Sequence, residues 1–136
     1  MMVGRQEPEV VAPRISVYSL QEIYAEMNAK YFGGAVKVKI EWSKRLVGRA
    51  RAYRRLGSYY PEKKLIRVNP LLDNADFPPY FISYIVYHEM LHHVYPPFRK
   101  GGRWHIHHAT FKKKEKEFEE YALAKQWEKN NKKMFF

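Results

Sequence analysis

The pentapeptide His88-Glu89-Met90-Leu91-His92 has the residue types and the spacing that metal-dependent chemistry requires. On a helix, side chains four positions apart lie on one face one turn apart, so the two histidines can bind one metal ion. Glu89 then flanks the open coordination position, where it can act as a general base. This arrangement is typical of a zinc hydrolase.

The residues around this motif predict a buried helix. From Tyr80 to His92 the sequence is apolar on nearly every helical face, which is typical of a central helix and not of a solvated one. Ionisable groups inside such a helix need a partner or a metal ion, because desolvation of a charge is costly. The surroundings of the motif therefore favour a metal site over chance occurrence.

A catalytic zinc ion needs a third protein ligand as well as an open position for water. Pro96 and Pro97 end the motif helix, a loop is expected at 98–103, and a second long helix is predicted at 104–130. Helical phase places His107 in line with Phe111, on the face that this second helix buries. His107 is therefore the first candidate for the third ligand.

Other residues are candidates for the same role. His108 lies on the polar face of the second helix and is the second choice, and His105 lies roughly opposite His107 and is the third. If His105, His107 and His108 all lie on the surface, or contact only the metal ligands and not the metal, a glutamate is the third ligand instead. Glu115 and Glu117 are the candidates in that case.

Several segments of the chain resemble the SprT-like (Spartan-type) zinc metallopeptidases. The resemblance covers about residues 16–122 and rests on residues 27–34, a strand with Trp42, residues 65–70, residues 88–93 and His107-x-x-x-Phe111. In that family the histidine of the last motif is the third zinc ligand, which the resemblance transfers to His107. The chain departs from the family in two respects: His108 replaces a usual glycine, and the absence of cysteine excludes the zinc ribbon that often follows the catalytic domain.

The resemblance implies a zinc-dependent endopeptidase in which His88, His92 and His107 bind one Zn²⁺ and Glu89 is the general base. Its protein substrates would be DNA-bound or DNA-crosslinked, because members of the family act on proteins attached to DNA. In zincins generally, the substrate pairs with an edge strand beside the cleft, which is expected here within 36–68. Two alternatives stay open: a basic nucleic-acid-binding module with a structural metal site, and a zinc hydrolase that acts on a non-protein amide.

The predicted fold is a single small α+β domain of the zincin type. A capping box at Ser19 starts the first helix, and strands are predicted at 36–42, 48–56 and 63–68. We expect an antiparallel sheet of about three strands with three main helices packed on one side. The domain boundaries are placed as follows: a flexible leader at 1–15, the SprT-like domain at 16–130 and a basic, aromatic tail at 131–136.

Composition limits the cellular setting. The 136 residues are 46% hydrophobic, contain no cysteine and include no apolar run of about 18 residues, so we expect a cytoplasmic protein that does not insert in membranes. Without cysteine, a metal site must use histidine, carboxylate or water. Many charged residues and tyrosines, with few Asn and Gln, fit a thermophilic source.

The net charge of +11 is concentrated in one region, between Lys37 and Arg67. Basic side chains can bind phosphates, and Trp42 with the nearby tyrosines offers rings on which unpaired bases can stack. We therefore expect DNA binding, with single strands favoured; the alternative is a solvated face of a basic protein. The candidate residues for this surface are Arg49, Arg51, Arg54, Arg55, Lys63 and Lys64.

Overall fold

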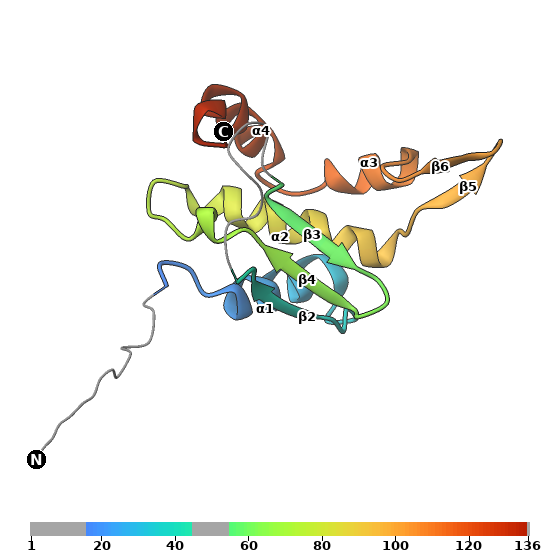
Figure 1. The fold of residues 1–136 in the computed structure, drawn as a ribbon, viewed down its shortest axis with the longest axis horizontal. Helices are drawn as coiled ribbons and strands as arrows, with labels where there is room; N and C mark the ends of the chain where they lie inside the picture. Colours follow the sequence, from blue (N-terminus) through green and yellow to red (C-terminus); the bar gives the residue numbers. More distant parts are fainter. Residues whose placement is uncertain (1–15, 45–54, 136) are drawn as a thin grey trace, which may run out of the picture.

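The structure, a computed structural model, describes residues 16–44 and 55–135 and has the predicted α+β architecture (Figure 1). Its main elements are α1 (Leu20–Phe32), β2 (Lys39–Trp42), β3 (Gly57–Tyr60), β4 (Leu65–Val68), α2 (Pro79–Val94), β5 (Phe98–Lys100), β6 (Arg103–His105), α3 (Ala109–Glu115) and α4 (Tyr121–Asn130). Two short 3-10 helices, η2 (Pro70–Leu72) and η3 (Lys132–Phe135), complete the order. None of the described helices is long and apolar enough to cross a membrane.

The three-stranded sheet has the order β2-β4-β3 and is mixed. β3 pairs with β4 in antiparallel fashion, as predicted, whereas β2 pairs with β4 in parallel. The prediction of an all-antiparallel sheet is therefore wrong for β2. The tight turn at 61–64 fixes β3 on one edge of β4, so β2 must use the other edge, where its chain direction matches that of β4.

The strand boundaries also differ from the prediction in one place. β3 spans Gly57–Tyr60, which lies between the strands predicted at 48–56 and 63–68. The strand predicted at 48–56 falls mostly on residues 45–54, which lie outside the described residues. Periodicity did not indicate β3, because this strand is only half-buried and alternates weakly between apolar and polar residues.

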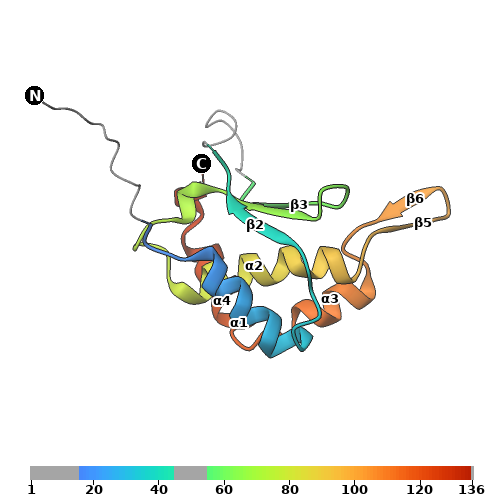
Figure 2. The same cartoon turned by 90° about the horizontal axis from the view of Figure 1, so that it is seen from below.

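The helices lie on one side of the sheet, as Figure 2 shows. α1 and α2 contact the strands, and α3 and α4 pack against α2. α1 begins at Ser19, whose hydroxyl oxygen accepts a hydrogen bond from the Glu22 backbone N–H at 3.2 Å, so the predicted cap is confirmed. α2 buries nine side chains, including that of Glu89, and is the buried central helix that the sequence predicts.

The single long helix predicted at 104–130 is wrong. Residues 98–105 form the β5–β6 hairpin instead, with Gly101 and Gly102 at φ 63° and 75° in its two-residue turn. Consecutive left-handed residues are what such a tight hairpin turn requires, and glycine supplies them without strain. The remaining helix is interrupted at 116–120, where Phe118 enters the core and the Glu119 backbone N–H donates to the Tyr31 hydroxyl at 2.9 Å.

The residues after α4 join the core through Phe135. Its side chain is fully buried, with ring centroids 5.9 Å from Phe81, 6.3 Å from Phe77 and 6.1 Å from Trp127. The basic residues Lys132 and Lys133 of η3 stay exposed. The C-terminal segment therefore packs against the N-terminal half of α2 and the residues before it.

We expect Phe135→Ala to lower the free energy of unfolding by about 3 kcal/mol, because it removes a buried aromatic ring and leaves a cavity. Urea unfolding followed by circular dichroism measures the change. Leu123→Ala is the control, since Leu123 is 54% exposed on α4 and should cost less than about 0.5 kcal/mol. Similar losses in the two variants would contradict the packing of Phe135.

Candidate metal centre

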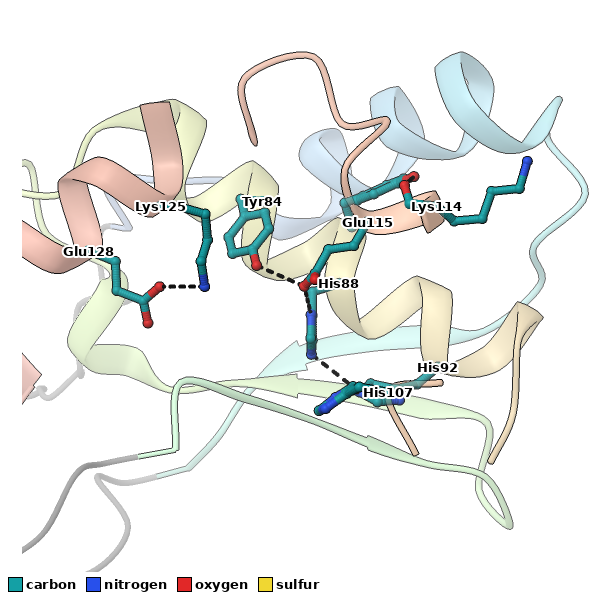
Figure 3. A network of polar contacts seen from close by, with 9 residues as sticks. Tyr84, His88, His92, His107, Lys114, Glu115, Lys125 and Glu128 are labelled. Atoms are coloured by element: carbon teal, nitrogen blue, oxygen red, sulfur yellow. Dashed lines mark hydrogen bonds and ion pairs between the residues drawn. The ribbon is translucent and has the colours of Figure 1, made fainter. Parts of the chain in front are cut away.

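Three histidine side chains converge at the C-terminal half of α2. His88 and His92 come from successive turns of this helix, and His107 comes from the bend between β6 and α3 (Figure 3). The Nε2 atoms of His88 and His92 are 3.3 Å apart, and those of His92 and His107 are 3.2 Å apart. One ring nitrogen from each of the three residues lies within 4.8 Å of the others.

This donor set fits a zinc ion. Nitrogen ligands at about 2.0–2.1 Å from a tetrahedral zinc ion are separated by roughly 3.3 Å, which matches the two Nε2 separations. Burial, together with the charges of the neighbouring His88 and His107, lowers the pKa of His92 to about 4. Burial also lowers the pKa of His107. Both residues are therefore neutral at pH 7, which is the form that binds metal.

Glu89 lies beside the histidines and is 6% exposed. Burial raises the pKa of its carboxyl group to about 7, while the charges of His88 and Arg55 act in the opposite direction. A carboxyl group that titrates near neutral pH is well matched to proton transfer at that pH. The helix motif thus places a candidate metal site and a proton acceptor, the Glu89 carboxylate, next to each other.

Gly57 at the start of β3 leaves the space that Glu89 occupies. A Cβ atom on residue 57 would lie 2.9 Å from Glu89 Oε2, 3.1 Å from Glu89 Cγ and 3.1 Å from Ile85 Cγ2. Any larger side chain would therefore displace the carboxylate or the strand. No sequence pattern indicates this role, because the contact joins residues that are far apart along the chain.

The Phe111 ring packs against the rings of all three histidines. Its side chain is fully buried, and its ring centroid lies 5.1 Å from that of His88, 4.7 Å from that of His92 and 4.9 Å from that of His107. His107 precedes α3, which begins at Ala109. His107 joins the cluster, as predicted. However, no helix is present at this residue, so helical phase is not the reason for its position.

His105 and His108 do not join the cluster. His108 is the N-cap of α3: its Nδ1 accepts from the Phe111 backbone N–H at 3.4 Å, and its Nε2 lies 3.3 Å from the Pro96 carbonyl oxygen. The Nε2 atom of His105 lies 3.3 Å from the Lys100 carbonyl oxygen within the hairpin. Each of these side chains thus has a local structural contact.

The two glutamates proposed as alternative ligands also lie elsewhere. Glu115 Oε2 lies 2.6 Å from His88 Nδ1, the ring nitrogen on the side away from the cluster, and accepts a hydrogen bond from the Tyr84 hydroxyl at 2.8 Å (Figure 3). Burial raises the pKa of Glu115, but these two hydrogen bonds together with the charges of His88 and Lys125 lower the pKa overall. Glu117 is exposed and pairs with Lys114 at 3.5 Å.

A groove extends from the cluster in two directions. One hollow runs towards α4 and is lined by Tyr84, Lys125 and Glu128, and the other runs towards the β3–β4 turn and is lined by Tyr59 and His93. Both hollows are lined by the same central residues: Arg55, Gly57, His88, Glu89 and His107. The candidate centre therefore lies in the middle of the groove and not at its end.

The residues proposed for nucleic-acid binding do not form one described surface. Arg49, Arg51 and Arg54 lie outside the described residues. Arg55 lines the groove beside Glu89, and Lys64 lines the hollow of the groove near Tyr59. Lys63 and Lys64 are exposed at the β3–β4 turn and line a further hollow together with Lys37 and Lys39.

Comparison with known proteins agrees with this site. The sequence profile of the SprT-like family matches residues 20–132, a span that includes all three histidines and Glu89. The chain belongs to the SprT-like family. No curated protein and no solved structure matches it. Membership of the SprT-like family, together with the histidine cluster, indicates a metallopeptidase-like domain with a metal site.

Proposed function

We propose that this SprT-like protein is a zinc-dependent endopeptidase. The observation that carries the proposal is the convergence of three histidine ring nitrogens beside a buried glutamate in the middle of a groove. A groove that continues on both sides of the reacting groups accommodates a chain that extends in both directions. This feature favours internal cleavage of a polypeptide over hydrolysis of a small amide.

In this mechanism His88, His92 and His107 would hold a zinc ion through their ring nitrogens. When bound, zinc would supply a Lewis acid that favours the attack of water on a peptide carbonyl group. The Glu89 carboxylate accepts a proton from the attacking water and returns it to the amine that leaves. Gly57 keeps the space in which this carboxylate lies.

The substrate backbone is proposed to pair with β3. Among the described strands, β3 is an edge strand, because it pairs only with β4. Its first residue, Gly57, contacts Glu89, so a peptide added to this edge passes directly by the catalytic carboxylate. Backbone pairing of this kind binds many sequences, since the hydrogen bonds come from the main chain.

We expect the zinc-loaded protein to cleave a denatured protein at internal bonds, and a strong chelator to reduce the rate by at least about 100-fold. Mass spectrometry of the fragments identifies the cleaved bonds, and restored activity after addition of Zn²⁺ excludes damage by the chelator. Hydrolysis of small amides alone would support the non-protein hydrolase. A four-ligand zinc site without hydrolysis would support the structural-metal alternative.

We also propose that the protein substrates are bound or crosslinked to DNA. Support comes from the surface lysines at the β3–β4 turn and at the start of β2: Lys37, Lys39, Lys63 and Lys64. These four side chains surround one hollow and can neutralise neighbouring phosphates. Lys64 also lines the hollow of the groove near Tyr59, so DNA bound to these lysines would lie beside the proposed peptide groove.

A variant with these four lysines changed to Gln is expected to bind single-stranded DNA more weakly. The slope of log affinity against log salt concentration should become shallower by about 0.7 for each phosphate contact that is lost. The matched control changes four exposed lysines of the C-terminal third of the chain to Gln: Lys113, Lys116, Lys129 and Lys132. Equal weakening in both variants would indicate a general effect of net charge and contradict a DNA site at this turn.

A further inference from the structure

Glu115 is a buried carboxylate that the proposed reaction does not use. Its side chain is 14% exposed, whereas that of Glu117, two residues later, is 48% exposed. It ends α3 and reaches across to α2, where it contacts His88 and Tyr84 (Figure 3). Burial of a carboxylate costs free energy unless strong hydrogen-bond partners compensate for the lost water, so the partners of Glu115 indicate a specific role.

The contact determines which nitrogen of His88 is available to a metal ion. Because a carboxylate only accepts hydrogen bonds, His88 must carry its proton on Nδ1, which lies 2.6 Å from Glu115 Oε2. Nε2 is then unprotonated, and this is the atom that lies 3.3 Å from His92 Nε2 in the cluster. Glu115 therefore favours the tautomer of His88 that can act as a ligand through Nε2.

Tyr84 fixes the carboxylate in turn. Its hydroxyl donates to the same Oε2 atom at 2.8 Å, and it lies one helical turn before His88 on α2. One turn further along the same helix, Tyr87 donates to the Lys114 carbonyl oxygen at 2.5 Å. Two tyrosines of α2 thus hold the end of α3 in place, at the residue that contacts His88 and at the residue before it.

We propose that Glu115 and Tyr84 are positioning residues for the metal centre, which hold His88 in the orientation and tautomer that bind zinc. This proposal rests on the zinc site of the proposed function but not on peptidase activity. Partners of this kind orient ligands from outside the coordination sphere, and their loss weakens metal binding by about 10- to 100-fold. The helix α3 thereby contributes to the centre even though none of its residues belongs to the histidine cluster.

Zinc affinity of the full chain, measured by competition with a chromophoric chelator, tests the proposal. We expect Glu115→Gln to weaken zinc binding by about 10- to 100-fold, because a neutral amide is a poorer acceptor than a carboxylate. Tyr84→Phe should weaken it by about two- to tenfold, as for loss of one hydrogen bond. Glu117→Gln is the matched control on the same segment and should bind zinc like the wild type.

Two spectroscopic measurements separate positioning from other roles. In the metal-free protein, ring ¹⁵N shifts should show Nδ1-protonated His88 in the wild type and a mixture of tautomers in Glu115→Gln. With Co²⁺ in place of zinc, the visible spectrum should remain that of the same coordination number in both proteins. A changed coordination number in Glu115→Gln would make Glu115 a ligand and overturn the proposal.

The proposal also fails if Glu115→Gln folds and binds zinc within twofold of the wild type. If Glu115→Gln unfolds, Tyr84→Phe decides the question, because it keeps the ring packing and removes only the hydroxyl group. A difference in zinc affinity between the Glu115 and Glu117 variants supports the positioning role even if the wild type cleaves no peptide. The positioning role and the peptidase function therefore fail separately.

Discussion

Glu89→Gln is expected to reduce peptide hydrolysis by about 10²- to 10⁴-fold, which is the contribution of a general base, while zinc stays bound. The amide keeps the shape of the side chain in its buried site beside Gly57 but cannot accept the proton of the attacking water. Steady-state cleavage of a fluorogenic peptide gives kcat and KM, and zinc content is measured on the same sample. We expect kcat to fall with little change in KM.

A matched control for this variant is Glu117→Gln, which makes the same chemical change at an exposed position of the same chain. It should keep the wild-type rate. Undiminished cleavage by Glu89→Gln would contradict the role of Glu89 as the base. Loss of zinc in this variant would instead show that the carboxylate helps to hold the ion, and the measured rate would then no longer isolate proton transfer.

His107→Ala is expected to lower zinc content from one ion per chain to a small fraction and to abolish hydrolysis with it. Two histidines of α2 would remain, and a catalytic zinc site requires three protein ligands. Zinc content after dialysis against a buffered low concentration of Zn²⁺ measures the effect. His107 is exposed on the groove side, so its replacement should leave the fold intact.

His105→Ala and His108→Ala are the controls for this prediction, because neither side chain joins the cluster. Both should keep zinc. His108→Ala should also lower the free energy of unfolding by about 1 kcal/mol, since it removes the N-cap of α3. Zinc loss in His108→Ala but not in His107→Ala would transfer the third ligand to His108 and contradict the assignment.

The features that the sequence predicted correctly are those that depend on neighbours within one or two helical turns. The Ser19 cap of α1 and the buried helix α2 follow from local hydrogen bonding and from the distribution of apolar residues along one helix. The pairing of His88 and His92 follows from the helical repeat alone. These features need no knowledge of what α1 or α2 packs against.

The second half of the chain shows where such local reasoning fails. Helical periodicity predicted one helix at 104–130. Instead, Gly101 and Gly102 allow a tight hairpin turn, and burial of Phe118 interrupts the helix that follows. Strand pairing outweighs helix propensity in the first case, and tertiary packing outweighs it in the second. β2 pairs with the edge of β4 that β3 leaves free, and its parallel direction could not be read from the strand patterns.

By itself, the sequence determined the α+β class, the motif helix and the placement of His88 and His92 on successive turns of that helix. The tertiary structure decided which residues surround them: His107 from a bend, Gly57 beside the carboxylate, Arg55 in the groove and Glu115 on the outer nitrogen of His88. The physical reason is one of range. Helix periodicity and caps act over three or four residues, whereas these contacts join segments from 15 to more than 30 residues apart, which only the packing of the core brings together.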